Sequence, residues 1–187
     1  MYRRNLLLAA GASIVAGCTT TSGGSSDPAA KRAEINAEVD KALSDLYAKV
    51  PGSRELLVSA RGVLVFPKVI SAGFVVGGSY GEGSLRKSGT TAGYYSMGAG
   101  SVGLLAGAQS KAVYLLFMSQ EALTKFEASK DGWTAGVDAS VALINVGADA
   151  QATSQTLKAP IIGYVLTNAG LMANLSFDGT KFTKLAL

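Results

Sequence analysis

The sequence predicts an α+β fold, with N-terminal helices followed by a curved, glycine-rich, mainly antiparallel β-sheet or partial barrel that carries one inserted helix. Three observations predict this fold. Apolar residues recur every three or four positions through residues 28–50, which is the spacing of a helix with one buried face. Between Gly62 and Gly107, twelve glycines are interspersed with β-branched, aromatic and small residues. A capped helical segment at 119–129 then separates this region from further strand-like sequence.

The predicted helices come first in the chain. Asp27 followed by Pro28 is a favourable helix start, because aspartate caps free backbone N–H groups and proline fits the first helical position. The pair Pro51-Gly52 should end this helix, and a second short helix capped by Ser53 is expected over 53–60. The apolar stripe of the first helix consists of Ile35, Val39, Leu43, Leu46 and Val50.

The glycine-rich region predicts a bent sheet. Glycine within a strand costs entropy and packing, so its density here indicates bulges, sharp bends and closely approaching strands. Residues 74–81 alternate with the period of two that is typical of a strand, and the apolar run 112–118 predicts a central strand. Further strands are expected at 63–66, 135–148, 161–167, 171–177 and 181–187, with a loop at 151–158.

Turn and cap residues complete this assignment. Ser119 should cap the inserted helix, which would direct Ala122, Leu123 and Phe126 inward and end before Gly132. The turns of the last strands are expected at Asn168-Ala169-Gly170 and Asp178-Gly179, of which Asp-Gly is the stronger hairpin signal.

Residues 1–17 have the pattern of a secretory signal peptide. Arg3 and Arg4 form a short basic region, and the apolar run 6–16 is too short to span a bilayer as a helix. Val15-Ala16-Gly17-Cys18 then resembles a lipobox, in which the cysteine receives diacylglycerol and further acyl chains such as palmitate. We therefore expect cleavage before Cys18. The alternative is a buried apolar N-terminus with a chance cysteine.

The expected anchor also suggests a domain organisation and a location. The lipidated Cys18 and a flexible Thr/Ser/Gly tether would occupy 18–27, and 28–187 would form a single domain. The protein is then expected in the cell envelope, held by lipid. Thr19 rather than aspartate follows the cysteine, which favours the outer membrane, facing the periplasm, if the cell is Gram-negative.

Composition restricts the function classes. The 187 residues contain one cysteine and no histidine, so no internal disulfide can form and no cysteine- or histidine-based metal site is expected. The net charge is +4, of which Arg3 and Arg4 supply two units. The remaining charge is too small to favour nucleic acid as a partner, because phosphate binding needs a concentrated basic face.

The sequence offers few residues or motifs suited to catalysis or cofactor binding. Without histidine, the common general base and the usual serine triad are both missing. The carboxylates Glu82, Asp138 and Asp149 have no spacing that pairs them. Residues 98–103 match the letters of a dinucleotide-binding fingerprint, but too few residues follow for the helix that would receive the pyrophosphate. We expect a glycine-rich strand there, no cofactor and no enzymatic activity.

Basic residues beside the glycine-rich strands suggest a different role. Lys68, Arg86, Lys87 and Lys111 flank these strands, and a cluster of cations near strand ends would attract anionic lipid headgroups. These four residues are the predicted headgroup contacts. The alternative for each of them is a solvated surface charge.

Several short motifs, in order along one domain, resemble the SYLF lipid-binding family. The first is Ala60-Arg61-Gly62 leading into an apolar strand and Lys68, followed by Gly73-Phe74 and Gly81-Glu82-Gly83. The later motifs are Gly107-Ala108-Gln109-Ser110, Gly132-Trp133, Gly136-Val137-Asp138-Ala139, Gly170-Leu171 and Asp178-Gly179-Thr180. The resemblance covers about residues 33–185. One departure is Lys111-Ala112, where the eukaryotic members commonly have an acidic residue shortly after the Gly-Ala-Gln-Ser stretch.

This resemblance implies a non-catalytic protein that binds phospholipid, with a phosphoinositide preference in the eukaryotic branch. It also suggests the bacterial lipoprotein branch of the family. We therefore expect a membrane-anchored lipoprotein that binds anionic phospholipid headgroups, with no assigned protein partner. Two alternatives remain open at this point: a structural envelope lipoprotein that binds a protein or peptidoglycan, and a hydrolase of unknown substrate.

Overall fold

A computed structural model describes residues 27–73, 76–102, 107–144, 158–167, 170–171 and 177–187. The expected signal peptide, Cys18 and most of the tether lie outside these ranges. The first half of the chain forms α1 (Pro28–Lys49), α2 (Ser53–Ser59), β1 (Gly62–Gly73), β2 (Val76–Lys87), β3 (Thr90–Val102) and β4 (Gly107–Phe117). The second half forms α3 (Gln120–Ala128), β5 (Trp133–Thr134), β6 (Ala142–Leu143), β7 (Ile161–Thr167), β8 (Gly170–Leu171) and β9 (Lys181–Lys184).

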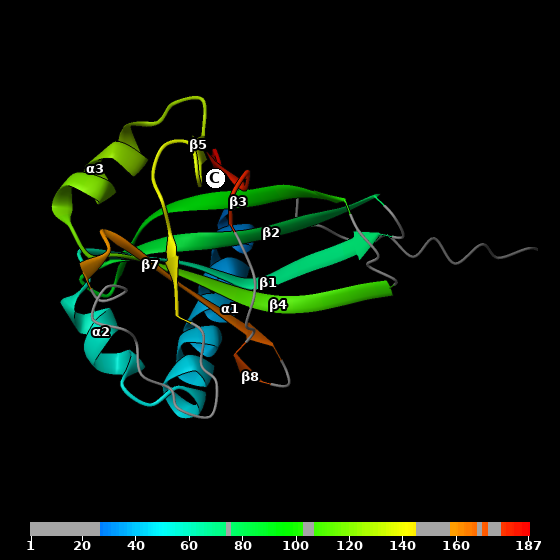
Figure 1. The fold of residues 1–187 in the computed structure, drawn as a ribbon. Coiled ribbons are helices and arrows are strands. Elements are labelled where there is room, and N and C mark those ends of the chain that lie inside the picture. The colour runs from blue at the N-terminus through cyan, green and yellow to red at the C-terminus, as the bar shows by residue number, and fades with distance from the viewer. Residues whose placement is uncertain (1–26, 74–75, 103–106, 145–157, 168–169, 172–176) are drawn as a thin grey trace, which may run out of the picture.

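The described strands belong to one curved sheet that forms a half-barrel (Figure 1). Its order is β5-β9-β3-β2-β1-β4-β7-β6, and β8 pairs with β7. Neighbouring strands are antiparallel except for β6 and β7, which are parallel. The predicted α+β fold with a curved, mainly antiparallel sheet is therefore confirmed, and β4 is the central strand expected over 112–118.

Helix α1 covers one face of the sheet. Asp27 caps its first turn by accepting a hydrogen bond from the Ala29 backbone N–H at 2.9 Å. Of the predicted stripe, Ile35, Val39 and Leu46 are buried within the helix and Val50 is buried just after it. Leu43 is only half-buried, and Ala42, which is not part of the stripe, is buried as well. They pack with inward residues of the strands, and the buried Tyr114 hydroxyl of β4 donates to the Ala42 carbonyl at 2.8 Å. Helix α1 is therefore part of the core.

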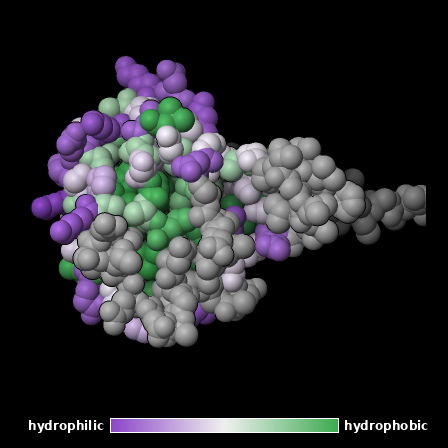
Figure 2. Space-filling view, viewed as in Figure 1, coloured by the Kyte–Doolittle hydropathy of each residue, from purple (hydrophilic) through white to green (hydrophobic). Residues whose placement is uncertain are grey.

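The opposite face is covered by α3 and the segment that follows it. Its core is aromatic, with Phe126 of α3 lying 5.7 Å from Trp133 and 4.9 Å from Phe117 between ring centroids. Trp133 and Phe182 bring the short strands β5 and β9 into the same cluster. Figure 2 shows apolar residues in the middle of the face in view, with hydrophilic residues along its outer rim. Two hydrophobic clusters, one on each face, therefore hold the sheet.

A bulge in β1 lengthens this strand beyond the predicted 63–66. The register shifts between Val65 and Lys68 against β2, and between Phe66 and Val69 against β4. Proline is tolerated at a bulge, so the strand passes through Pro67 and continues to Gly73. The extra residue lets Phe66 and Val69 both enter the cluster under α3 although they are three positions apart.

Beyond this bulge the four longest strands extend past the helices as an arm (Figure 1). We define the arm as the described residues 70–73, 76–80, 98–102 and 107–110. Pairing of β4 with β7 begins at Ala112, and pairing of β3 with β9 ends at Gly98. Gly98 and Gly100 lie within β3, as expected for a glycine-rich strand rather than a dinucleotide-binding turn, and Gly103 lies outside the described residues.

Some element predictions were wrong. Ser53 is the first helical residue of α2 and not its cap. The cap position is Gly52, in the left-handed conformation with φ of 78°, and the Ser53 hydroxyl donates to the Leu46 carbonyl. The strand expected over 135–148 is replaced in the described part by a turn after β5 and the two-residue β6. The last strand ends at Lys184 rather than Leu187.

The structure confirms the predictions for α3, β7 and the Asp178-Gly179 turn. Ser119 caps α3 by accepting from the Ala122 N–H at 3.1 Å, and Ala122, Leu123 and Phe126 are buried. Strand β7 has the predicted bounds, and the Asp178-Gly179 turn forms with the Thr180 N–H donating to the Phe177 carbonyl at 2.8 Å. All of the predicted loop at 151–158 except Lys158, the alternating residue Phe74 and most of the predicted strand 171–177 lie outside the described residues.

Candidate lipid-facing site

A groove of about 280 Å³ lies between α1 and the strands β1, β4 and β7. Four lysines and two carboxylates are among its lining residues, so this set has an excess of two positive charges. The charged lining residues are Glu38, Lys41, Asp45, Lys49, Lys68 and Lys111, and the remaining lining includes Ser110, Tyr114 and Thr167.

Helix α1 contributes half of these lysines. Lys41, Asp45 and Lys49 follow one another at four-residue spacing and therefore share a helix face. The Lys41 Nζ atom lies 3.7 Å from the Asp45 Oδ2 atom in a solvent-exposed pair, which constrains neither side chain strongly. Sequence reasoning missed Lys41 and Lys49, which lie off the apolar stripe of the helix. Their spacing was the signal that could have found them.

Lys68 and Lys111, predicted from the sequence, both line this groove. Lys68 is exposed and stands opposite Glu82, on the face that α1 covers. Lys111 stands opposite Val69, whose side chain belongs to the other face, and it borders the groove where β4 runs past its pairing with β7. Burial lowers the pKa of Lys111. An anion beside this ammonium would oppose that effect, so anion binding at Lys111 favours its charged form.

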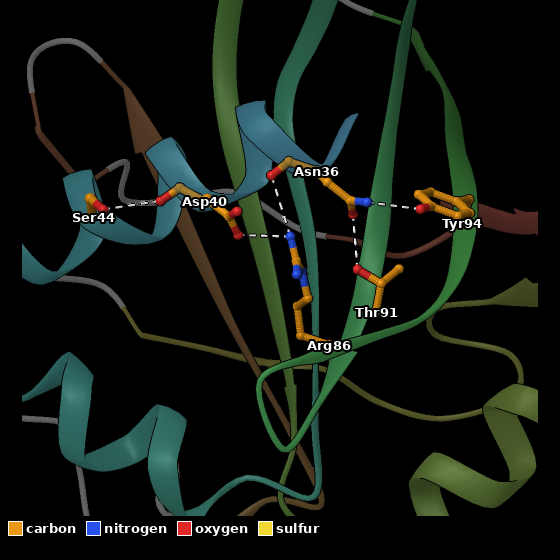
Figure 3. A network of polar contacts seen from close by, with 6 residues as sticks. All are labelled: Asn36, Asp40, Ser44, Arg86, Thr91 and Tyr94. Atoms are coloured by element: carbon orange, nitrogen blue, oxygen red, sulfur yellow. Dashed lines mark hydrogen bonds and ion pairs between the residues drawn. The ribbon is translucent and has the colours of Figure 1, made fainter. Parts of the chain in front are cut away.

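Arg86 and Lys87 lie elsewhere and are engaged within the protein. The Arg86 Nη2 atom donates to the Asp40 carboxylate at 2.7 Å and to the Asn36 carbonyl at 3.3 Å (Figure 3). Lys87 pairs with both carboxylate oxygens of Glu127 in α3, at 3.0 and 3.1 Å. The four predicted headgroup contacts are therefore divided, with two at the groove and two in ion pairs that join helices to the sheet.

The Asn36 side chain extends the Arg86 network. Its Oδ1 atom accepts from the Thr91 hydroxyl at 2.9 Å, and its Nδ2 group donates to the Tyr94 hydroxyl at 2.9 Å (Figure 3). These contacts join α1 to β2 and β3. They hold the helix that forms one wall of the groove.

A second groove, of about 350 Å³, lies where α1 and α2 meet the β2–β3 turn. Its walls are mainly apolar, with Leu43, Tyr47, Leu57, Val58 and Val63 among the lining residues. The Arg54 guanidinium carbon lies 4.3 Å from the centre of the Tyr47 ring at its rim. This groove lacks the lysine-rich lining of the first one.

The carboxylates considered as catalytic candidates have structural partners. Glu82 pairs with Lys31 at 2.8 Å and accepts from the Tyr80 hydroxyl at 2.9 Å, whereas Asp138 accepts from the Thr134 backbone N–H at 2.5 Å within a turn. Asp149 lies outside the described residues. Across the described ranges, no three His, Cys, Asp or Glu side chains come together as metal ligands. Among the same residues, no helix is both long and apolar enough to cross a membrane.

Comparison with known proteins supports the family resemblance. A family model named Ysc84, described as "Las17-binding protein actin regulator", matches residues 98–185. None of the curated proteins compared is similar enough to count as a match. This domain points to a lipid-binding or actin-related role. The matched residues 98–185 run from the second half of β3 to just beyond β9, and over this part of the chain the match bears out the SYLF (Ysc84) domain that the sequence motifs indicate.

Proposed function

We propose that the protein is an exported lipoprotein, acylated on Cys18 after removal of residues 1–17, whose domain binds anionic phospholipid headgroups and catalyses no reaction. It would reside in the cell envelope, at the outer membrane facing the periplasm if the cell is Gram-negative. The observation that carries this proposal is the groove beside α1, where four lysines meet only two carboxylates.

The excess of positive charge supports weak binding of the groove to anionic headgroups, which a membrane tether would strengthen. A lysine near an anionic membrane surface contributes about 1 kcal/mol, so the excess charge of the groove alone gives modest affinity. A lipid anchor at Cys18 would keep the groove beside the bilayer at a high effective concentration. Anchor and groove together would then account for stable association with anionic membranes.

Vesicle flotation tests this proposal with protein that lacks residues 1–18. The test variant replaces Lys49, Lys68 and Lys111 by Ala. The charge-matched control replaces three exposed lysines outside the groove by Ala: Lys130, Lys158 and Lys184. Binding to phosphatidylglycerol vesicles at low salt should be retained by the control and lost by the test variant. Equal binding by the two variants, or no binding by the unaltered protein, would sink the proposal.

A protein partner is the second candidate function. The description of the matched family as Las17-binding favours it, and the apolar groove beside α2 offers a surface for such a partner. In this case the protein would be an envelope lipoprotein that holds a protein or peptidoglycan and ignores lipid. A pull-down from envelope extract, compared with flotation of the same protein, separates the two functions.

A further inference from the structure

Two large apolar side chains stand exposed side by side on the arm. Ile70 of β1 and Tyr80 of β2 are directly opposite one another in the register, with exposed fractions of 48% and 54%. Residues opposite one another in an antiparallel pair point to the same face, so their side chains form one patch. The other large apolar residues exposed to this degree in the described chain, Val58 and Val137, lie apart, in α2 and in the turn after β5.

The surroundings of this pair make it prominent. Tyr80 faces Gly98 on β3, and Ile70 faces Ser110 on β4. The next pair along the arm on the same face is Ala72 and Gly78. Because these neighbours have small or no side chains, Ile70 and Tyr80 rise above the surface of the arm.

The chain enters the fold beside this pair. Helix α1 begins at Pro28, and within its first turn Lys31 forms a 2.8 Å ion pair with Glu82, the residue to which the Tyr80 hydroxyl donates. The tether between Cys18 and Pro28 consists of nine residues, which span at most about 30 Å when fully extended. A bilayer that holds an acylated Cys18 would therefore lie within reach of Ile70 and Tyr80.

We propose that Ile70 and Tyr80 insert into the interfacial region of the bilayer that holds the acylated Cys18, so that the arm fixes the orientation of the domain on the membrane. This inference rests on the proposed lipid anchor. Tyrosine suits a membrane interface because it has an apolar ring and a polar end, and isoleucine adds apolar area. The nearby Glu82 carboxylate is neutralised by Lys31, which reduces its repulsion from anionic headgroups.

The size of the patch favours a bilayer over a protein. A stable protein interface buries about 800 Å² on each partner. Two side chains among glycine, alanine and serine offer much less apolar surface than this. For a protein that is already anchored, however, a shallow insertion of two side chains is enough to select one orientation.

A fluorophore beside the pair tests the insertion. The chain has a single cysteine, so once Cys18 is acylated an introduced cysteine is the only free thiol. The full chain with Ala72→Cys carries a polarity-sensitive label on the same exposed face while keeping Ile70 and Tyr80. Matched controls carry the label at Val58→Cys or Val137→Cys. Each protein is reconstituted in phosphatidylcholine–phosphatidylglycerol vesicles, with and without a nitroxide on the acyl chains.

The emission maximum of the label at position 72 should shift to shorter wavelength when vesicles are present. The nitroxide lipid should quench this label several-fold more than the labels at positions 58 and 137. Adding Ile70→Ser and Tyr80→Ser should reduce this quenching to the control level, while the circular dichroism spectrum shows that the sheet is retained. Equal quenching at all three positions, or quenching that the serine variants do not change, would overturn the insertion alone. Labelling of Cys18 itself would show that it carries no acyl group and would overturn both proposals.

Discussion

Gly83 lies where β1 bulges toward β2, and its missing side chain makes room for the bulge. A Cβ atom added there would overlap the Val65 carbonyl oxygen and lie 2.9 Å from the Phe66 ring. Since backbone cannot move aside cheaply, we expect Gly83→Ala to lower the free energy of unfolding by about 2–4 kcal/mol. Gly98→Ala is the control, because nothing lies within 4 Å of its added Cβ, and it should change stability by less than about 1 kcal/mol. Urea unfolding measures both, and similar losses in the two variants would contradict this account.

Glu82 connects the start of α1 to β2 and should make stability depend on acid. Burial alone would raise its pKa, but hydrogen bonds from Lys31 and Tyr80 and the charge of Lys31 outweigh burial and hold the pKa of Glu82 below 4.5. A carboxyl with a lowered folded-state pKa stabilises the fold fully above its unfolded value, and this contribution is lost as the pH falls through the folded value. The stability difference between the unaltered protein and Glu82→Gln should therefore shrink below about pH 4.5.

Lys31 supplies the control for this acid dependence. The hydrogen bond to Glu82 raises the pKa of Lys31 above 10.5, so Lys31 remains charged throughout the acid range. Lys31→Met removes the main interaction that lowers the pKa of Glu82 against the effect of burial. In this background the acid-dependent stability difference between the protein that keeps Glu82 and its Glu82→Gln variant should therefore be smaller. Chemical unfolding of the four proteins between neutral pH and pH 3 measures it. The same acid dependence in both backgrounds would show that the ion pair is not its source.

At the scale of elements, the attachment of α1 to the sheet combines an apolar stripe with a polar network. Arg86 is the centre of this network, and its side chain is only 14% exposed where it meets Asp40. We expect Arg86→Ala to destabilise the protein by about 1–3 kcal/mol, because hydrogen bonds to a charged, largely buried group are lost. The exposed pair Lys125–Glu121 within α3 gives the comparison, and Lys125→Ala should cost less than about 1 kcal/mol. Thermal unfolding distinguishes them, and equal losses would argue against a docking role for Arg86.

The success of sequence reasoning also differs by element. Local rules located α1, α3 and β7 well, because a cap, a periodic stripe or an apolar run lies within each segment. They failed where long-range packing decides. Strand β1 continues through Pro67 because Gly83 on another strand leaves room for a bulge, and no local signal shows this. Similarly, the sequence predicts Lys68 as a headgroup contact, whereas Lys41 and Lys49 line the same groove only because α1 packs against the sheet.

At the scale of the whole molecule, several features gather on the face that α1 covers. The lysine-rich groove lies along α1, Lys68 stands in it, and Ile70 and Tyr80 follow on the same face of the arm. The start of α1, where the proposed tether would end, is joined to β2 beside this arm through Lys31 and Glu82. In the proposed complex with a membrane, one orientation presents the acylated Cys18, the cations and the apolar pair to the bilayer together.

The proposed orientation depends on the proposed anchor, so removal of the acylation site gives the broadest prediction. Cys18→Ser replaces the thiol needed for the thioether bond to diacylglycerol, and two or three acyl chains are what hold a lipoprotein stably. We expect the full chain with this change to move from the membrane fraction to the soluble fraction when membranes are washed with concentrated salt, which screens attraction between lysines and headgroups. Thr19→Ser, a change of similar size at the next position, should stay in the membrane fraction. A Cys18→Ser protein that survives the wash on the membrane would show that something other than acylation holds it there.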